Sequence, residues 1–136
     1  MIKTYDVFRA IYSKLKTLPY EVYDEVPKTA KNPHIRIDAS YNTDKSGKNY
    51  DGIVYYQYIH VFSTYNGRKE ILEIVDSIIE LLSEDIETDE FVAYSTLERN
   101  DITTKAATVG GDVTGYYINE QYRHALLEYR FIVYKK

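Results

Sequence analysis

Cysteine is absent from this 136-residue sequence, and glycine and proline are scarce, with six and three residues. The lack of cysteine excludes disulfides and thiolate-bound metal. No apolar run approaches the ~18 residues of a membrane span, and residues 1–16 contain no uninterrupted apolar stretch and no small-residue cleavage site. We therefore expect no membrane segment and no secretory signal. The length predicts a single domain over residues 1–136.

Basic residues are also in short supply, since 17 lysines and arginines face 21 acidic residues and give a net charge of −4. This balance argues against a nucleic-acid binder driven by overall charge, which would usually be basic. The hydrophobic fraction depends instead on 16 tyrosines. Tyrosine is common in strands, but it also suits protein interfaces because its apolar ring carries a hydroxyl. A self-assembling surface is thus one reading of the surplus.

The apolar pattern predicts two amphipathic helices, over residues 7–18 and 71–82, because apolar side chains recur there at three- and four-residue spacing. Segments with alternating apolar residues or many β-branched and aromatic residues predict four strands: residues 35–39, 53–63, 91–104 and 124–134. The second of these strands is apolar on both parities, as expected where both faces of a strand contact protein. Val22 and Tyr23 are expected only as a short extended piece before Pro27.

The predicted order is therefore α-β-β-α-β-β, with a polar hairpin loop at residues 42–52 and a long loop or lengthened hairpin tip at residues 105–119. Consecutive strand pairs favour an antiparallel sheet. Two one-sided helices should cover one of its faces. The predicted fold class is α+β, a two-layer sandwich with an antiparallel sheet of about four strands and two helices on one face.

Catalytic and metal-binding motifs are missing from the sequence. His34, His60 and His124 have none of the spacings that metal or catalytic sites use, and no serine lies in a nucleophile elbow. Scattered carboxylates such as Asp38 and Glu98 could belong to a metal-dependent nuclease, but any chain with this many acids offers such combinations. We expect no enzyme activity, no cofactor and no metal.

An acidic segment follows the second predicted helix, with six acids and no basic residue between positions 80 and 90. Acids near a helix C-terminus oppose the macrodipole, so local stability does not explain them. The segment is either a solvated helix end or a surface that meets a basic partner or repels DNA. Its candidate residues are Glu84, Asp85, Glu87, Asp89 and Glu90.

The turn between the strong strand and the second helix carries the opposite charge. Asn66 fits an N-cap position and Gly67 permits a tight turn, while Arg68 and Lys69 follow at the start of the helix. Basic residues there are mildly unfavourable against the helix dipole, which gives a reason to expect a partner carboxylate. The candidate contact residues are Tyr65, Asn66, Arg68 and Lys69 in this turn, and Lys45 and Lys48 in the polar loop.

Several segments in order resemble one known family. The strand–turn–helix "YIHVFSTYNGRKEILEIVDSIIELL", the closing strand "YRHALLEYRFIVY", and Val26-Pro27 followed by Pro33-His34-Ile35-Arg36-Ile37 look like the tail-completion or tail-terminator proteins of long-tailed bacteriophages. That family is similar in fold to the minor tail protein U of phage lambda. Residues 105–119 do not align with the family pattern.

The resemblance implies a structural virion protein without catalysis. Such proteins form a ring, usually a hexamer, on the head-proximal end of the tail. The ring ends tail-tube polymerisation and joins the tail to the head. Implied partners are further copies of the chain, the tail-tube protein and a head-completion or neck protein, with DNA passing through the lumen without specific binding. Assembly would take place in the host cytoplasm, with no membrane involved.

Two other readings stay open at the level of sequence. A head-completion or neck adaptor of the same connector would share most of these features. A monomeric α+β ligand-binding module would instead need an apolar pocket with convergent polar groups.

Overall fold

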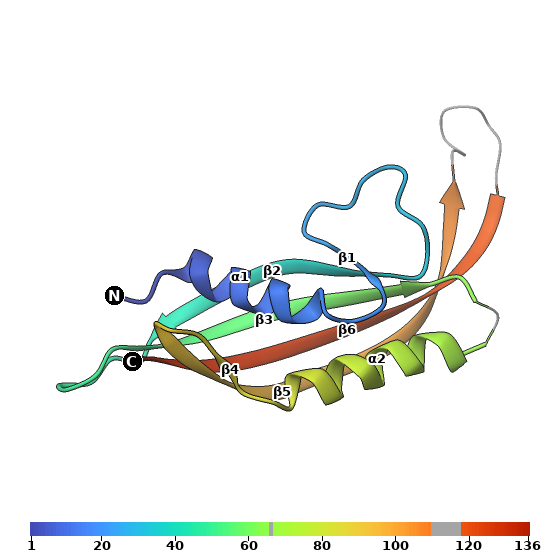
Figure 1. Ribbon diagram of the computed structural model, residues 1–136. Coiled ribbons are helices and arrows are strands. Elements are labelled where there is room, and N and C mark those ends of the chain that lie inside the picture. The colour runs from blue at the N-terminus through green and yellow to red at the C-terminus, as the bar shows by residue number, and fades with distance from the viewer. Residues whose placement is uncertain (66, 110–117) are drawn as a thin grey trace.

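The computed structural model describes residues 1–65, 67–109 and 118–136, with backbone alone between residues 104 and 122. Figure 1 shows two helices lying against one long sheet. The helices are α1 (Thr4–Leu15) and α2 (Lys69–Leu82). The described residues form six strands: β1 (Glu21–Tyr23), β2 (His34–Asp44), β3 (Gly52–Ser63), β4 (Ile86–Glu87), β5 (Phe91–Val109) and β6 (Ile118–Lys135).

The sheet corrects the predicted fold class. Its order is β1-β2-β3-β6-β5-β4, and β1 pairs parallel to β2, whereas every other neighbouring pair is antiparallel. The prediction of a four-stranded antiparallel two-layer sandwich is wrong: the fold is a curled, mixed sheet of six strands with two helices. Very long strands twist strongly, and β2 and β5 are each interrupted by a bulge, which increases bending.

The two short strands at the sheet edges explain the error in strand number. β1 has three residues and β4 has two, too few to show a period-two pattern. The long strands also extend past their predicted ends. β2 continues to Asp44, β5 to Val109, and β6 begins at Ile118, so most of the described part of residues 105–119 is strand. Residues 110–117 lie outside the described part of the chain.

Both helices form near the predicted positions, although α1 ends at Leu15 rather than at residue 18, and both bury their apolar stripe. Val7, Ile11 and Leu15 of α1 are buried, as are Ile71, Ile74, Val75, Ile78 and Leu82 of α2. Gly67 has a φ of 99°, a conformation that glycine adopts without the Cβ clash of other residues. Helix α2 begins at Lys69, and Arg68 occupies its N-cap position without a side-chain hydrogen bond to the helix. The prediction of Asn66 as N-cap is therefore wrong. Asn66 itself lies outside the described residues.

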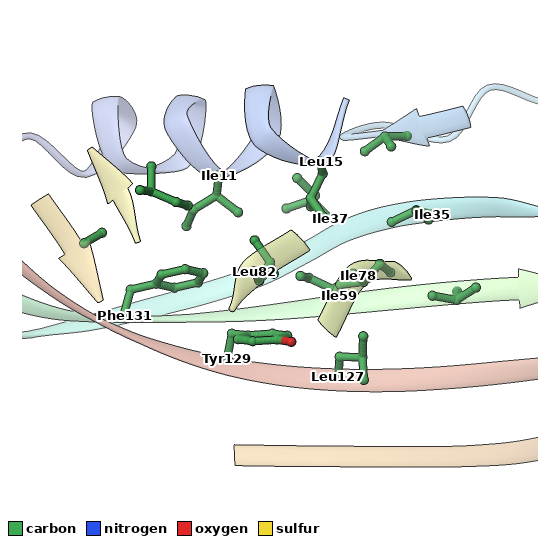
Figure 2. Close-up of a cluster of buried hydrophobic side chains, with 14 of the residues drawn as sticks. Ile11, Leu15, Ile35, Ile37, Ile59, Ile78, Leu82, Leu127, Tyr129 and Phe131 are labelled. Atoms are coloured by element: carbon green, nitrogen blue, oxygen red, sulfur yellow. The ribbon is translucent and has the colours of Figure 1, made fainter. Parts of the chain in front are cut away.

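The core lies between the helices and one face of the sheet. Figure 2 shows Ile11 and Leu15 of α1 reaching toward Ile37, Ile59 and Phe131 on the strands. Alternate residues of β3 and β6 point into this layer and are fully or almost fully buried. No described helix is long and apolar enough to cross a membrane.

One buried polar side chain sits in this core beside the bulge of β2. Gln57 is fully buried, and its Nε2 donates to the carbonyls of Asp38, Ala39 and Tyr58 at 2.8, 3.3 and 2.9 Å. Its Oε1 accepts from the Tyr55 hydroxyl at 3.2 Å. Buried polar groups of this kind are normally hydrogen-bonded. Here the amide satisfies the bulge carbonyls that the strand ladder leaves out.

Candidate assembly surfaces

The face of the sheet opposite the helices has no covering element among the described residues. In an antiparallel sheet with one solvated face, the outward positions are normally polar. On β3 these positions instead hold Val54, Tyr56, Tyr58, His60 and Phe62, all half-buried by one another. The sequence predicted that both faces of this strand contact protein, and only one of them is covered by an element among the described residues. We call this side the helix-free face.

Tyrosine rings dominate the helix-free face. Tyr41 of β2 stacks on Tyr56 with ring centroids 4.4 Å apart and planes 9° apart, and Tyr58 lies next to this pair. Toward the other edge of the same face, Tyr94 of β5 meets the ring of Tyr134 edge-on. Tyr41 and Tyr94 remain 46% and 44% exposed. Exposed aromatic rings on rigid strands are the side chains that protein interfaces favour.

Most charges on the helix-free face are matched in pairs, while Glu128, opposite Tyr58, is hydrogen-bonded to Tyr41 instead. Arg36 contacts Asp38 at 3.3 Å, Arg130 contacts Glu98 at 2.9 Å, and Arg99 contacts Asp101. The buried Nε of Arg130 makes no hydrogen bond, so its contact with Glu98 is an ion pair only. The described part of this face thus has no surplus of basic charge of the kind that phosphate binding requires.

The same face carries a histidine cluster that was not predicted from the sequence. His60 Nδ1 lies 2.5 Å from His124 Nε2, and His60 Nε2 lies 2.8 Å from Asp38 Oδ2. Phe62 stacks between this pair and the ring of His34. Burial lowers the pKa of His34. Both ring nitrogens of His60 are engaged, and the described residues contain no group of three potential ligands arranged for a metal ion.

The turn that joins β3 to α2, with Tyr65, Arg68 and Lys69, lies at one end of β3. We call it the basic turn. Tyr65 is 51% exposed, and Arg68 and Lys69 are exposed at the start of α2. Within the described chain neither of these two cations forms an ion pair of 4 Å or less.

The turn itself is held from two sides. Ser63 Oγ donates to Glu70 at 2.7 Å, and Arg123 Nε donates to the Gly67 carbonyl at 2.6 Å. These contacts fix the backbone on either side of the basic residues. Arg68 and Lys69 are therefore exposed on a backbone that these contacts hold in place.

Lys45 and Lys48 do not join the basic turn. They lie in the β2–β3 connection at the opposite end of β3, a strand of 12 residues, which places them roughly 40 Å away at 3.4 Å per residue. This connection is tied to the chain termini, because Lys135 N donates to the Asp51 carbonyl at 3.0 Å. The structure thus divides the predicted basic residues between the two ends of the molecule.

The acidic segment lies at the same end as Lys45 and Lys48. Glu84 pairs with Lys14 at 3.0 Å, and Glu87 pairs with Lys136 at 2.6 Å. The hydrogen bond from Lys136 lowers the pKa of Glu87. Asp85, Asp89 and Glu90 are exposed and line an open cleft of about 740 Å³ between α1 and the β4–β5 turn. Part of this negative charge is therefore neutralised within the chain, and part is free to meet a partner.

Comparison with known proteins agrees with the resemblance seen in the sequence. The family described as "Tail completion protein gp17" matches residues 9–134. No curated protein matches. A chain of a solved structure described as "Virion of native gene transfer agent (GTA) particle" is similar in fold, with a TM-score of 0.60 and 19% identity over 93% of this chain and 92% of that chain. The chain belongs to the tail completion protein gp17 family.

Proposed function

We infer that this protein is a structural component of a phage or phage-like virion. It forms a ring, a hexamer in our proposal, on the head-proximal end of a long tail. The ring ends tail-tube polymerisation and provides the surface that joins the tail to the head. The observation that carries this proposal is the family match, which runs over residues 9–134 and so includes the second half of α1, all of α2 and, except for Lys135, all the long strands.

The arrangement of surfaces supports a role in assembly rather than chemistry. A subunit of a closed ring must offer two different patches that fit each other on neighbouring copies. It must also offer separate surfaces to the tube protein and to the head-completion or neck protein. This chain has a helix-free aromatic face, a basic turn at one end, and an acidic segment at the other end.

The basic turn and the acidic segment have assigned roles in this proposal. Tyr65, Arg68 and Lys69, with Asn66 beside them in sequence, contact a neighbouring subunit or the tube protein, and Lys45 and Lys48 do so at the other end. The exposed acids Asp85, Asp89 and Glu90 face the lumen, where negative charge reduces binding of DNA phosphates. Finding these acids on the outer rim of an assembled ring would remove the lumen role.

The proposal is tested by the mass of the purified protein with and without tail-tube protein of the same phage. We expect a closed oligomer, formed by the protein alone or on the tube end, and tubes of defined length in its presence. A protein that stays monomeric and never caps tubes would contradict the proposal. Binding to the head connector without any effect on tube length would favour the neck adaptor instead.

A further inference from the structure

The strand at each edge of the sheet is very short, so most of the neighbouring long strand has no partner on its outer side. β1 pairs only with His34, Ile35 and Arg36 of β2, and β4 pairs only with Val92 and Ala93 of β5. Beyond these short strands, within the described chain, residues 40–44 of β2 and residues 94–97 of β5 pair with a strand on one side only. Residues 40–44 are exposed throughout.

These open edges lack the usual protection against pairing. Native proteins blunt edge strands with charges, proline, bulges or a covering element. The edge segments read Ser-Tyr-Asn-Thr-Asp at residues 40–44 and Tyr-Ser-Thr-Leu at residues 94–97, without proline and with one charge, Asp44, at the end of the first segment. The bulges lie just outside them, between Ile37 and Ser40 and between Leu97 and Arg99. Each segment is therefore a regular strand edge with at most one charge, at its end, and it can accept another strand.

The two edges also match in level and direction. The pairing register places both in the same cross-strand rows, which are Tyr41–Tyr56–Arg130–Thr96 and Thr43–Val54–Ile132–Tyr94. Three antiparallel steps separate β2 from β5, so the two strands run in opposite directions. A rotation about an axis along the strands would bring β2 of one copy beside β5 of the next, as an antiparallel pair at the same level.

We propose that a second copy of this chain binds at this edge, with its β5 adding to β2 as an antiparallel strand. The contact is heterologous, so its repetition closes a ring, with these strand edges paired, when a whole number of copies completes one turn. Thr43 of one copy then faces Tyr94 of the next. Tyr41 and Tyr94 become diagonal neighbours on the helix-free face, within reach of aromatic contact. This assignment rests on the proposed ring and names the surface that builds it.

The absence of cysteine makes the pairing directly testable by disulfide trapping. In one chain Thr43 and Tyr94 lie three strand spacings apart, about 14 Å, too far for an internal disulfide. We expect the double variant Thr43→Cys with Tyr94→Cys, oxidised in the presence of tail-tube protein, to give a ladder at multiples of 16.0 kDa that continues beyond the dimer. Thr43→Cys with Glu73→Cys, which places the second thiol on the exposed side of α2, is the matched control and should give none.

Mixing the two single variants adds the decisive arm. Thr43→Cys and Tyr94→Cys proteins should each stay uncrosslinked alone and give a dimer when mixed. A dimer from Thr43→Cys alone would mean a symmetric β2–β2 contact and would overturn the proposal. A ring detected by mass without a ladder would overturn the edge pairing and leave the ring intact. A chain that forms no ring with or without tube protein would overturn the proposed function itself.

Discussion

Replacing Gln57 with leucine should destabilise the fold through the bulge of β2. Leucine has similar volume but no hydrogen-bonding atoms, so the carbonyls of Asp38, Ala39 and Tyr58 lose their donor, and the Tyr55 hydroxyl loses its acceptor. The amide has two N–H bonds, which the three carbonyls share. Two donated bonds and one accepted bond at about 1 kcal/mol each give a loss of about 3 kcal/mol in the free energy of unfolding.

Urea denaturation measures this loss directly. The same loss should also lower Tm. With an unfolding entropy near 2.1 cal/mol/K per residue over 136 residues, a loss of about 3 kcal/mol corresponds to a fall of about 10 °C in Tm. Tyr55→Phe is the matched control, because it keeps the Gln57 amide and its donated bonds while removing the Tyr55 hydroxyl with its bonds to Gln57 Oε1 and Ser40, and it should lower stability by about 1 kcal/mol. A Gln57→Leu variant within ~0.5 kcal/mol of the original protein would refute the view that this amide fixes the bulge.

Three further predictions follow from single side chains. Reversing both charges in Arg68→Glu with Lys69→Glu should block assembly in a sizing experiment, and should leave urea stability within ~0.5 kcal/mol because acids suit a helix start. Phe131→Ala should lower stability by roughly 3–5 kcal/mol in urea, because this ring is fully buried at the core centre. Tyr129→Phe should be neutral or stabilising by about 1 kcal/mol, because the Tyr129 hydroxyl is buried without a hydrogen-bond partner in the described chain. Burial also raises the pKa of Tyr129 to about 12, so this tyrosine ionises in the unfolded state at a lower pH than in the folded state. Stability should therefore fall as pH rises from about 10 to about 12, by up to ~1.4 kcal/mol per pH unit. Tyr129→Phe should make this fall less steep.

Each of these has a contrary outcome. Normal assembly of the charge-reversed variant would remove the basic turn from the interface. A loss below ~1 kcal/mol for Phe131→Ala would contradict the tight packing of the core. Clear destabilisation by Tyr129→Phe would show that the hydroxyl has a favourable partner.

The helices and long strands could be predicted because their periodicity is local. The stripe on α2 needs only the three- and four-residue spacing of its own isoleucines, valine and leucine. β4 could not be predicted, and β1 could be predicted only as a short extended piece at Val22 and Tyr23, because strands of two and three residues exist only through the neighbours they pair with. That difference changed the sheet from four antiparallel strands to six mixed ones.

The surfaces were predicted less well than the helices and long strands. Arg68 and Lys69 lie exposed together, whereas Lys45 and Lys48, the other predicted basic contact residues, lie at the other end of β3. His60 and His124 looked isolated because 64 residues separate them along the chain. Register across the β3–β6 pair brings them together, and register depends on the whole sheet. The tyrosine surplus was the useful signal, since it marks the helix-free face.

The central claim is that this chain closes into a ring at the end of a tail tube. The most direct test is to image purified tail tubes with and without this protein, and to measure the mass of the complex at the tube end. We expect one ring, a whole-number multiple of 16.0 kDa, at a single end of tubes that no longer grow. Tubes that keep growing beside a monomeric protein would contradict it.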